Sequence, residues 1–260
     1  MKKTPKQKVE EVFGKNADKY VTSNSHAKGD DLPLLVDWLK PEKTWKVLDI
    51  ATGGGHVTKT LAPHVATVFS TDLTRAMLEN TAKHLRHNFD NIEYVVADAE
   101  ALPFLTETFD AAVCRIAPHH FPQPDRFISE VAKVLKKGGK FILIDNVAPA
   151  DPELAEFMNT TERLRDHSHF RCLSKAEWAT LLKENGMKEL KSADRRKTFD
   201  YPSWVARTAE SEGQMEEVSR HLTGATQKAI DYFAINGQDG KIQDFTIDEW
   251  MALFEKVDQK

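Results

Sequence analysis

Glycines follow the first strongly apolar segment of the chain, in the stretch Val47–Gly55. Because glycine has no Cβ, Gly53 and Gly55 let the backbone turn tightly and approach a ligand closely. If the apolar segment is a strand of an open α/β sheet, this turn lies at the carboxyl edge, where such sheets bind nucleotide-like molecules. We therefore expect a nucleotide-like cofactor here, with Ala51 opening the turn.

The glycine pattern departs from two known phosphate-binding turns. The dinucleotide fingerprint G-x-G-x-x-G needs a small residue where His56 or Thr58 stands, and a bulky residue there hinders close helix–strand contact. No Gly-Lys-Ser/Thr follows, so the phosphate loop of nucleotide hydrolases is excluded. A nicotinamide-dependent oxidoreductase on a similar sheet is an alternative hypothesis, and the broken fingerprint counts against it.

Three acidic residues accompany the first three apolar segments. Asp49 lies in the first segment, and Asp72 and Asp98 end the second and third. Taken singly, each fits a strand-end acid or a helix N-cap. Their placement at successive strand ends favours a shared ligand site.

Two adjacent histidines, His119 and His120, follow the fourth apolar segment at the same edge. Histidine changes charge near neutral pH, so either residue suits a general base. In the alternative interpretation, one packs or caps the next helix and the other faces solvent. Three roles fit Arg115. It could hold a substrate anion, line the cofactor pocket, or pair with an acid on a neighbouring strand.

A second polar cluster lies inside the stretch 151–185, between two predicted helices. It contains Arg165, His167 and His169. The His-x-His spacing occurs in metal sites, but no third ligand is evident, so we predict no metal. The cluster is either a solvated, salt-bridged loop or one wall of a substrate site.

Five short apolar segments alternate with amphipathic helical patterns in the first half of the chain. The segments are 45–51, 66–72, 92–98, 109–116 and 140–145. Alternating strands and helices form right-handed βαβ units and a parallel sheet. Because the segments are almost continuously apolar, helices cover both faces of that sheet. The pattern predicts a doubly wound, mostly parallel α/β sheet.

Further elements flank this core. We expect helices in 6–40 and 203–236, a strand at 187–199, and either a strand or a helix at 245–257. We predict one domain overall, divided into a helical lid at 1–40, a cofactor-binding core at 41–150, and a helical cap with C-terminal strands at 151–260.

The composition excludes several classes of protein. The 260 residues are 40% hydrophobic and 29% charged, unlike a disordered chain, a fibrous repeat or a disulfide-stapled mini-protein. The net charge of −4 gives no general attraction to nucleic acid. No secretory signal or membrane span is evident, and there are only two cysteines. We expect a cytoplasmic protein with no nucleic-acid partner; its oligomeric state is left open.

The glycine turn resembles motif I of the class I S-adenosylmethionine (SAM) methyltransferases, in which an acid precedes a G-x-G-x-G turn. Asp49, Gly53 and Gly55 match that motif. Ala51 stands where the first glycine is usual, and we interpret it as compatible with a negative φ there.

The resemblance continues along the chain. It implies that Asp72 accepts hydrogen bonds from the ribose hydroxyls and that Asp98 and the Ala99 backbone N–H contact the adenine. Further cofactor contacts are implied at Leu73, Met77 and Arg115, although Met77 at helical spacing equally fits a core position.

Segments 109–113 and 135–143 resemble later motifs of the family, so the resemblance covers about 45–147. It implies a seven-stranded sheet, SAM as cofactor and S-adenosylhomocysteine as product. The chain is most similar to the small-molecule branch that includes the ubiquinone/menaquinone C-methyltransferases. This branch places substrate residues in N-terminal additions and after the fifth strand, which implies a role for Tyr20 in a lid and for Arg165, His167 and His169 in substrate binding.

The resemblance therefore implies methyl transfer to a small molecule, with a carbon, oxygen or nitrogen acceptor left open. A SAM-binding protein without catalysis is a further hypothesis, because of Ala51 and because no base is obvious. The segment after the fourth strand lacks an Asn-Pro-Pro-Tyr motif, which disfavours a nucleic-acid substrate.

Overall fold

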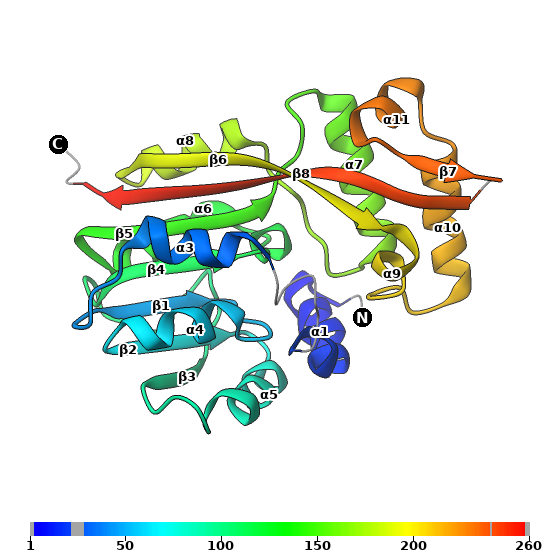
Figure 1. The fold of residues 1–260 in the computed structure, drawn as a ribbon. Coiled ribbons are helices and arrows are strands. Elements are labelled where there is room, and N and C mark those ends of the chain that lie inside the picture. The colour runs from blue at the N-terminus through cyan, green and yellow to red at the C-terminus, as the bar shows by residue number, and fades with distance from the viewer. Residues whose placement is uncertain (1–2, 22–28, 240, 258–260) are drawn as a thin grey trace.

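The computed structural model describes residues 3–21, 29–239 and 241–257, with only the backbone described for 15–21. An eight-stranded sheet forms the centre of this described part (Figure 1), in the order β3-β2-β1-β4-β5-β8-β6 with β7 paired to β8. The strands are β1 (Lys46–Ile50), β2 (Thr67–Asp72), β3 (Ile92–Val96), β4 (Phe109–Arg115), β5 (Leu135–Asn146), β6 (Met187–Asp200), β7 (Asn236–Gln238) and β8 (Lys241–Lys256). Strands β3, β2, β1, β4 and β5 run parallel, and β8 runs antiparallel between β5 and β6. The predicted doubly wound, mostly parallel sheet is confirmed, with the short β7 added to the expected seven strands.

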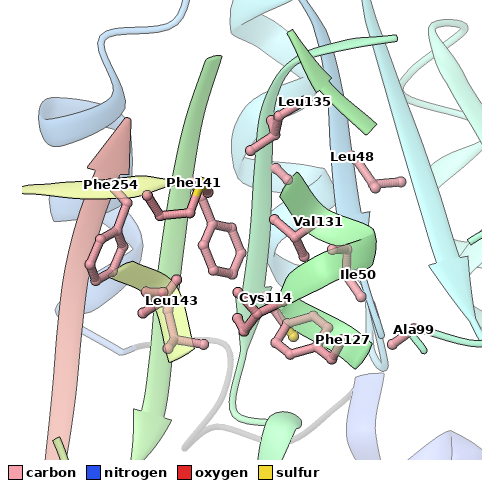
Figure 2. Close-up of a cluster of buried hydrophobic side chains, with 14 of the residues drawn as sticks. Leu48, Ile50, Ala99, Cys114, Phe127, Val131, Leu135, Phe141, Leu143 and Phe254 are labelled. Atoms are coloured by element: carbon pink, nitrogen blue, oxygen red, sulfur yellow. The ribbon is translucent and has the colours of Figure 1, made fainter. Parts of the chain in front are cut away.

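Helices cover both faces of the sheet, which explains the nearly continuous apolar segments. Leu48 and Ile50 of β1 pack in one layer with α6 and α8, and Val47 packs in the other with α3 and α4. These helices are α3 (Asp31–Leu39), α4 (His56–Leu61), α6 (Pro124–Val134) and α8 (Lys175–Glu184). Figure 2 shows the first layer, where Phe127 of α6 lies among the strand side chains. Each such fully buried side chain contributes about 1.5–3 kcal/mol.

The strand order reverses between β1 and β4, which are neighbours although β2 and β3 separate them in the sequence. Chain connections leave this point in opposite directions, so a crevice opens at the carboxyl ends of the two strands. Helix α5 (Arg75–Leu85) packs beside β2 and β3, and α1 (Pro5–Val21) packs on α5 at this edge of the sheet (Figure 1).

The helical cap is built on two long strands that extend beyond the core. β6 and β8 pair from Met187↔Lys256 to Asp200↔Asp244, past the end of β5. There, cap helices pack around Phe245 and Ile247 in an apolar cluster of their own (Figure 1). The cap helices are α7 (Pro152–Arg165), α9 (Tyr201–Val205), α10 (Glu212–Thr223) and α11 (Gln227–Phe233). The segment at 245–257, left open between strand and helix, belongs to strand β8 up to Lys256.

No helix within the described ranges is both long and apolar enough to cross a membrane. The division into 1–40, 41–150 and 151–260 within one domain stays a prediction.

Candidate functional site

Three residues in the turn after β1 have a left-handed backbone conformation, with positive φ angles. The φ angle is +54° at Ala51, +53° at Gly53 and +78° at Gly55. The expectation of a negative φ at Ala51 is therefore wrong. An L-residue in this conformation costs about 1–2 kcal/mol. Neighbouring bonds hold the turn, because the Thr52 N–H donates to the Thr71 carbonyl of β2 at 2.7 Å.

The two predicted glycines of the turn have different surroundings. A Cβ on Gly55 would lie 2.4 Å from Cγ2 of Thr81, so Gly55 lets α5 pack closely. Gly53 instead faces open space, because a Cβ there would meet only the Met77 side chain, at 3.8 Å. Its carbonyl accepts a hydrogen bond from Thr81 Oγ1 at 2.7 Å, which ties the turn to α5. Met77 itself is buried, beneath this turn.

Asp49 is buried at the end of β1 and binds the turn to α4. Its Oδ2 accepts hydrogen bonds from Thr52 Oγ1 at 2.6 Å and from both the N–H and the Oγ1 of Thr58, at 3.0 and 2.6 Å. Burial raises the pKa of Asp49 in spite of these hydrogen bonds. The residue therefore organises the loop that surrounds the site.

Asp72 ends β2 and points its carboxylate at the same loop. Its Oδ2 accepts from the Gly53 N–H at 3.1 Å, and its Oδ1 accepts from the Thr74 N–H at 2.8 Å. Burial, with the nearby Asp49 charge as a smaller contribution, raises the pKa of Asp72 to about 6. A carboxylate has about four acceptor positions, so Asp72 keeps capacity for hydroxyl donors of a ligand.

Asp98 follows β3 and meets a residue that the sequence analysis did not find. Lys6 of α1 pairs with both Asp98 and Glu100, at 2.5 Å in each case. The Asp98 Oδ1 also accepts from the Glu100 N–H at 2.9 Å. Lys6 is separated from Asp98 by 92 residues, and no local pattern in the sequence signals this pairing.

A cavity of about 980 Å³, open mouth included, lies over these residues. Nine of the predicted residues line it: Asp49, Ala51, Gly53, Asp72, Leu73, Asp98, Ala99, Arg115 and His120. Helix α1 contributes Lys6, Val9 and Phe13 to the wall. We call this space the first cavity. Gly55, Met77 and His119 are outside its lining.

Arg115 both lines the first cavity and pairs with an acid. Its Nε donates to Asp31 Oδ2, and its Nη2 donates to Asp31 Oδ1 at 3.0 Å, with both side chains buried. Burial alone would raise the pKa of Asp31, but the guanidinium of Arg115 holds it below its usual value. Among the sequence alternatives, the structure thus shows an ion pair, here with the first residue of α3.

The chain brings together three histidines from two segments. His119 and His120 lie in a 3-10 turn (Pro118–His120) after β4, and their ring centroids are 4.3 Å apart. His169 stacks on His119 with centroids 5.5 Å apart. The Phe170 and Arg171 N–H groups donate to the His119 carbonyl at 2.9 and 3.0 Å, which joins the two segments.

His120 and His169 are held as neutral rings. The His120 Nδ1–H donates to the Ser168 carbonyl at 3.0 Å. Burial, aided by the His119 charge, lowers the pKa of His120 to about 4. The His169 Nε2–H donates to Asn159 Oδ1 at 3.0 Å, and burial lowers its pKa well below the usual value. His169 therefore supports the loop rather than contacting a ligand.

A second cavity of about 500 Å³, open space included, lies beyond the histidines. Phe13, Ile116 and His120 line it and also line the first cavity. Its remaining wall comes from His119, Asn146, Glu162, Arg165, Asp166, Lys197, Phe199, Trp204 and Arg207. The two cavities therefore adjoin across a shared wall between α1 and the carboxyl end of β4.

The structure places the predicted substrate residues differently with respect to the two cavities. Arg165 lines the second cavity, pairs with Glu162 at 2.8 Å and lies over the Trp204 ring at 4.2 Å. His167 is exposed and lines neither cavity. Tyr20 has no described side chain, and the polar lid segment 22–28 lies outside the described residues. In the part of the chain that the structure describes, no group of three or more metal-ligating side chains is arranged to hold a metal ion.

The strand order of the sheet is that of a Rossmann-like methyltransferase fold. The glycine turn after β1 and the acids at successive strand ends also fit this fold. A family model described as a methyltransferase domain matches residues 48–143. The chain is 35% identical over 234 residues to the uncharacterized methyltransferase YcgJ of Bacillus subtilis, spanning 88% of this chain and 92% of that protein. The chain belongs to the class I SAM-dependent methyltransferases.

Two further likenesses accompany this assignment. The solved structure of the candidate methyltransferase BH2331 from Bacillus halodurans superposes with a TM-score of 0.86 at 35% identity, covering 88% of this chain and all of that one. The ubiquinone/menaquinone biosynthesis C-methyltransferase UbiE of Wigglesworthia glossinidia brevipalpis is 28% identical over 178 residues, covering 64% of this chain and 68% of that protein. The predicted similarity to UbiE-like methyltransferases is confirmed, and the comparisons give no support to the oxidoreductase alternative.

Proposed function

We propose that this methyltransferase holds SAM in the first cavity and transfers the methyl group to a small molecule in the second. The observation that carries the proposal is the shared wall of the two cavities at Phe13, Ile116 and His120. Methyl transfer is an in-line displacement, so donor and acceptor sites must meet at one point. Holding both reactants in such an arrangement contributes about 7–11 kcal/mol toward the barrier.

The first cavity fits the chemistry of SAM. Asp72 offers carboxylate oxygens to ribose hydroxyls, and Asp98 and the Ala99 N–H suit the adenine amine and ring nitrogen. Gly53 presents backbone without a Cβ. When bound, the cofactor supplies a methyl group activated by its sulfonium charge. Asp72 in the wall, ionised above about pH 6, favours a cation and disfavours the pyrophosphate of a nicotinamide dinucleotide.

The second cavity suits a small acceptor. Its walls carry aromatic rings from Phe13, Phe199 and Trp204 together with polar side chains such as Asn146 and Arg165. Such mixed concave surfaces bind small organic ligands. Two cap helices contribute to its wall, through Glu162 and Arg165 of α7 and Trp204 of α9. A cytoplasmic location stays a prediction.

Calorimetric titration with SAM, S-adenosylhomocysteine and NADH tests the proposal. We expect saturable binding of both adenosyl ligands and a loss of at least about tenfold in affinity in Asp72→Ala, because charge-assisted hydrogen bonds each contribute about 1.5–3 kcal/mol. Asp90→Ala, at an exposed acid before β3, is the matched control and should bind as the wild type. Binding of NADH without any adenosyl-ligand signal would refute the proposal.

A further inference from the structure

The two adjacent histidines differ in how their rings are held. The Asp145 carboxylate accepts two hydrogen bonds from His119. Its Oδ1 accepts from Nδ1–H at 2.7 Å, and its Oδ2 accepts from the backbone N–H at 3.0 Å. Because a carboxylate only accepts, the proton of a neutral His119 is on Nδ1 and the lone pair is on Nε2. His119 lines the second cavity and is outside the lining of the first.

A second polar side chain of the same cavity, Asn146, has an acceptor atom without a hydrogen-bond partner among the described residues. Asn146, the last residue of β5, is 8% exposed and lines the second cavity. Its Oδ1 is buried and has no hydrogen-bond partner among the described residues. A buried amide oxygen left unpaired costs about 1–3 kcal/mol, so this position favours a ligand that donates a hydrogen bond.

We infer that His119 is the general base of the reaction and that it takes the proton of a weakly acidic hydroxyl on an acceptor bound in the second cavity. Asn146 binds a donor group of the same acceptor, and Asp145 is the positioning residue that sets the His119 tautomer. The inference rests on the proposed function and names the acceptor class, a compound with an ionisable hydroxyl.

The step balances in atoms and charge. The hydroxyl proton moves to Nε2 of His119, giving an imidazolium paired with Asp145. The oxygen lone pair forms the new bond to the methyl carbon, and the electrons of the broken carbon–sulfur bond stay on sulfur. The imidazolium then returns its proton to solvent. No oxidant, reductant or metal is needed.

The charges around His119 favour this role over His120. Burial acts to lower the pKa of His119, but Asp145, Glu162 and Asp166 raise it above its usual value. The other titratable or charged residues of the second cavity's wall are His120, Arg165, Lys197 and Arg207, and His169 stacks on the His119 ring. His120, with a pKa of about 4, is too weakly basic to accept a hydroxyl proton near neutral pH.

The test uses 4-nitrophenol, whose phenolate is coloured, as a probe of the second cavity in protein saturated with S-adenosylhomocysteine. In the wild type we expect the bound probe to ionise at a pH at least about one unit below that of the free probe, since a protonated His119 stabilises the phenolate. His119→Asn keeps a donor to Asp145 but lacks Nε2, so the shift should disappear. His167→Asn, at the exposed histidine, should keep it.

Two further variants distinguish a loss of the proposed proton transfer from a general loss of folding. Asp145→Asn should move the proton of neutral His119 from Nδ1 to Nε2, visible in nitrogen NMR of labelled histidine, and should abolish the probe shift. Asn146→Ala should weaken probe binding about tenfold. A probe that does not bind, or an ionisation shift that survives in His119→Asn, would overturn the inference. If S-adenosylhomocysteine fails to bind at all, the proposed function itself falls.

Discussion

At the carboxyl end of β2, the Asp72 carboxylate accepts two backbone hydrogen bonds while it is 9% exposed. Burial makes its folded-state pKa, about 6, higher than the value of 3.8 expected for an unfolded chain. The folded state therefore binds this proton more tightly than the unfolded state. The stability from Asp72 is complete below the unfolded pKa and is lost as the pH rises through about 6.

Replacing this carboxylate by an amide removes that dependence. We expect the free energy of unfolding of Asp72→Asn to gain about 2 kcal/mol relative to the wild type between about pH 4.5 and about pH 8. Urea unfolding of both proteins over this range measures the difference. A difference that does not change with pH would show that the pKa of Asp72 is not raised. Asp90→Asn, at an exposed acid, provides the control.

The sequence predicted the residues of the first cavity better than their roles. Nine predicted residues line that cavity because strand-end positions in a parallel sheet share an edge. Gly55 was predicted to bind the cofactor but faces Thr81, because its lack of a Cβ also serves helix packing. Asn146 and Asp145 went unnoticed, since a strand end with Asp-Asn carries no motif. Their contacts appear only in the folded chain, where Asp145 hydrogen-bonds His119 and Asn146 lines the second cavity.

Helix α1 is the element that covers the first cavity. Its attachment to the core includes Lys6, which pairs with Asp98 and Glu100 beyond β3. Burial opposes the charge of Lys6, but hydrogen bonds to these two acids raise its pKa above the usual value. An adenine amine bound to Asp98 would compete for the same carboxylate. Adenine binding at Asp98, as proposed above, would therefore weaken the attachment of α1 through Lys6.

Hydrogen exchange of the α1 amides tests this attachment. We expect Lys6→Ala to speed their exchange about fivefold in the free protein, because partly exposed ion pairs contribute at most about 1 kcal/mol. The amides of β1 should not change. Lys3→Ala is the control, since Lys3 pairs with Glu11 of the same helix rather than with the core. Equal exchange in both variants would contradict an attachment through Lys6.

The last strand, β8, shows why the sequence could not decide between a strand and a helix for one segment. In β8, Phe245, Ile247, Met251 and Leu253 alternate with residues such as Trp250 that are also buried. A strand covered on both faces loses the apolar–polar alternation that distinguishes it from a helix. Only the pairing with β5 and β6, which no local pattern encodes, decides its conformation. The parallel strands were easier to predict because glycines or acids mark their ends.

At the scale of the whole molecule, the ladder of β6 and β8 runs from the core into the cap. Phe245, buried in the cap cluster, lies on the same strand as Phe254 of the core. Backbone hydrogen bonds of this ladder, with one register shift between Glu189 and Lys191, therefore link the cap to the core. Such continuity favours unfolding of core and cap in one transition.

Phe245→Ala tests whether the chain unfolds as one unit. Truncating a buried phenylalanine costs about 3–5 kcal/mol. We expect far-ultraviolet circular dichroism and tryptophan fluorescence to shift together to a lower midpoint, since the five tryptophans lie in both core and cap. Leu190→Ala, at a half-exposed position of β6, should change the midpoint little. A separate early transition would instead divide the chain into two domains.

The wall that the two cavities share connects the two proposed binding sites through side chains that border both. Phe13 of α1 contacts the His120 ring edge-on, with centroids 5.0 Å apart, and both residues face both spaces. If SAM and its acceptor occupy the two cavities as we propose, each would meet Phe13 and His120 from its own side. Reciprocity then requires that any change one ligand makes in the affinity for the other is matched by an equal factor when the two bind in the opposite order. Any coupling between the two ligands would therefore pass through a single helix and one histidine.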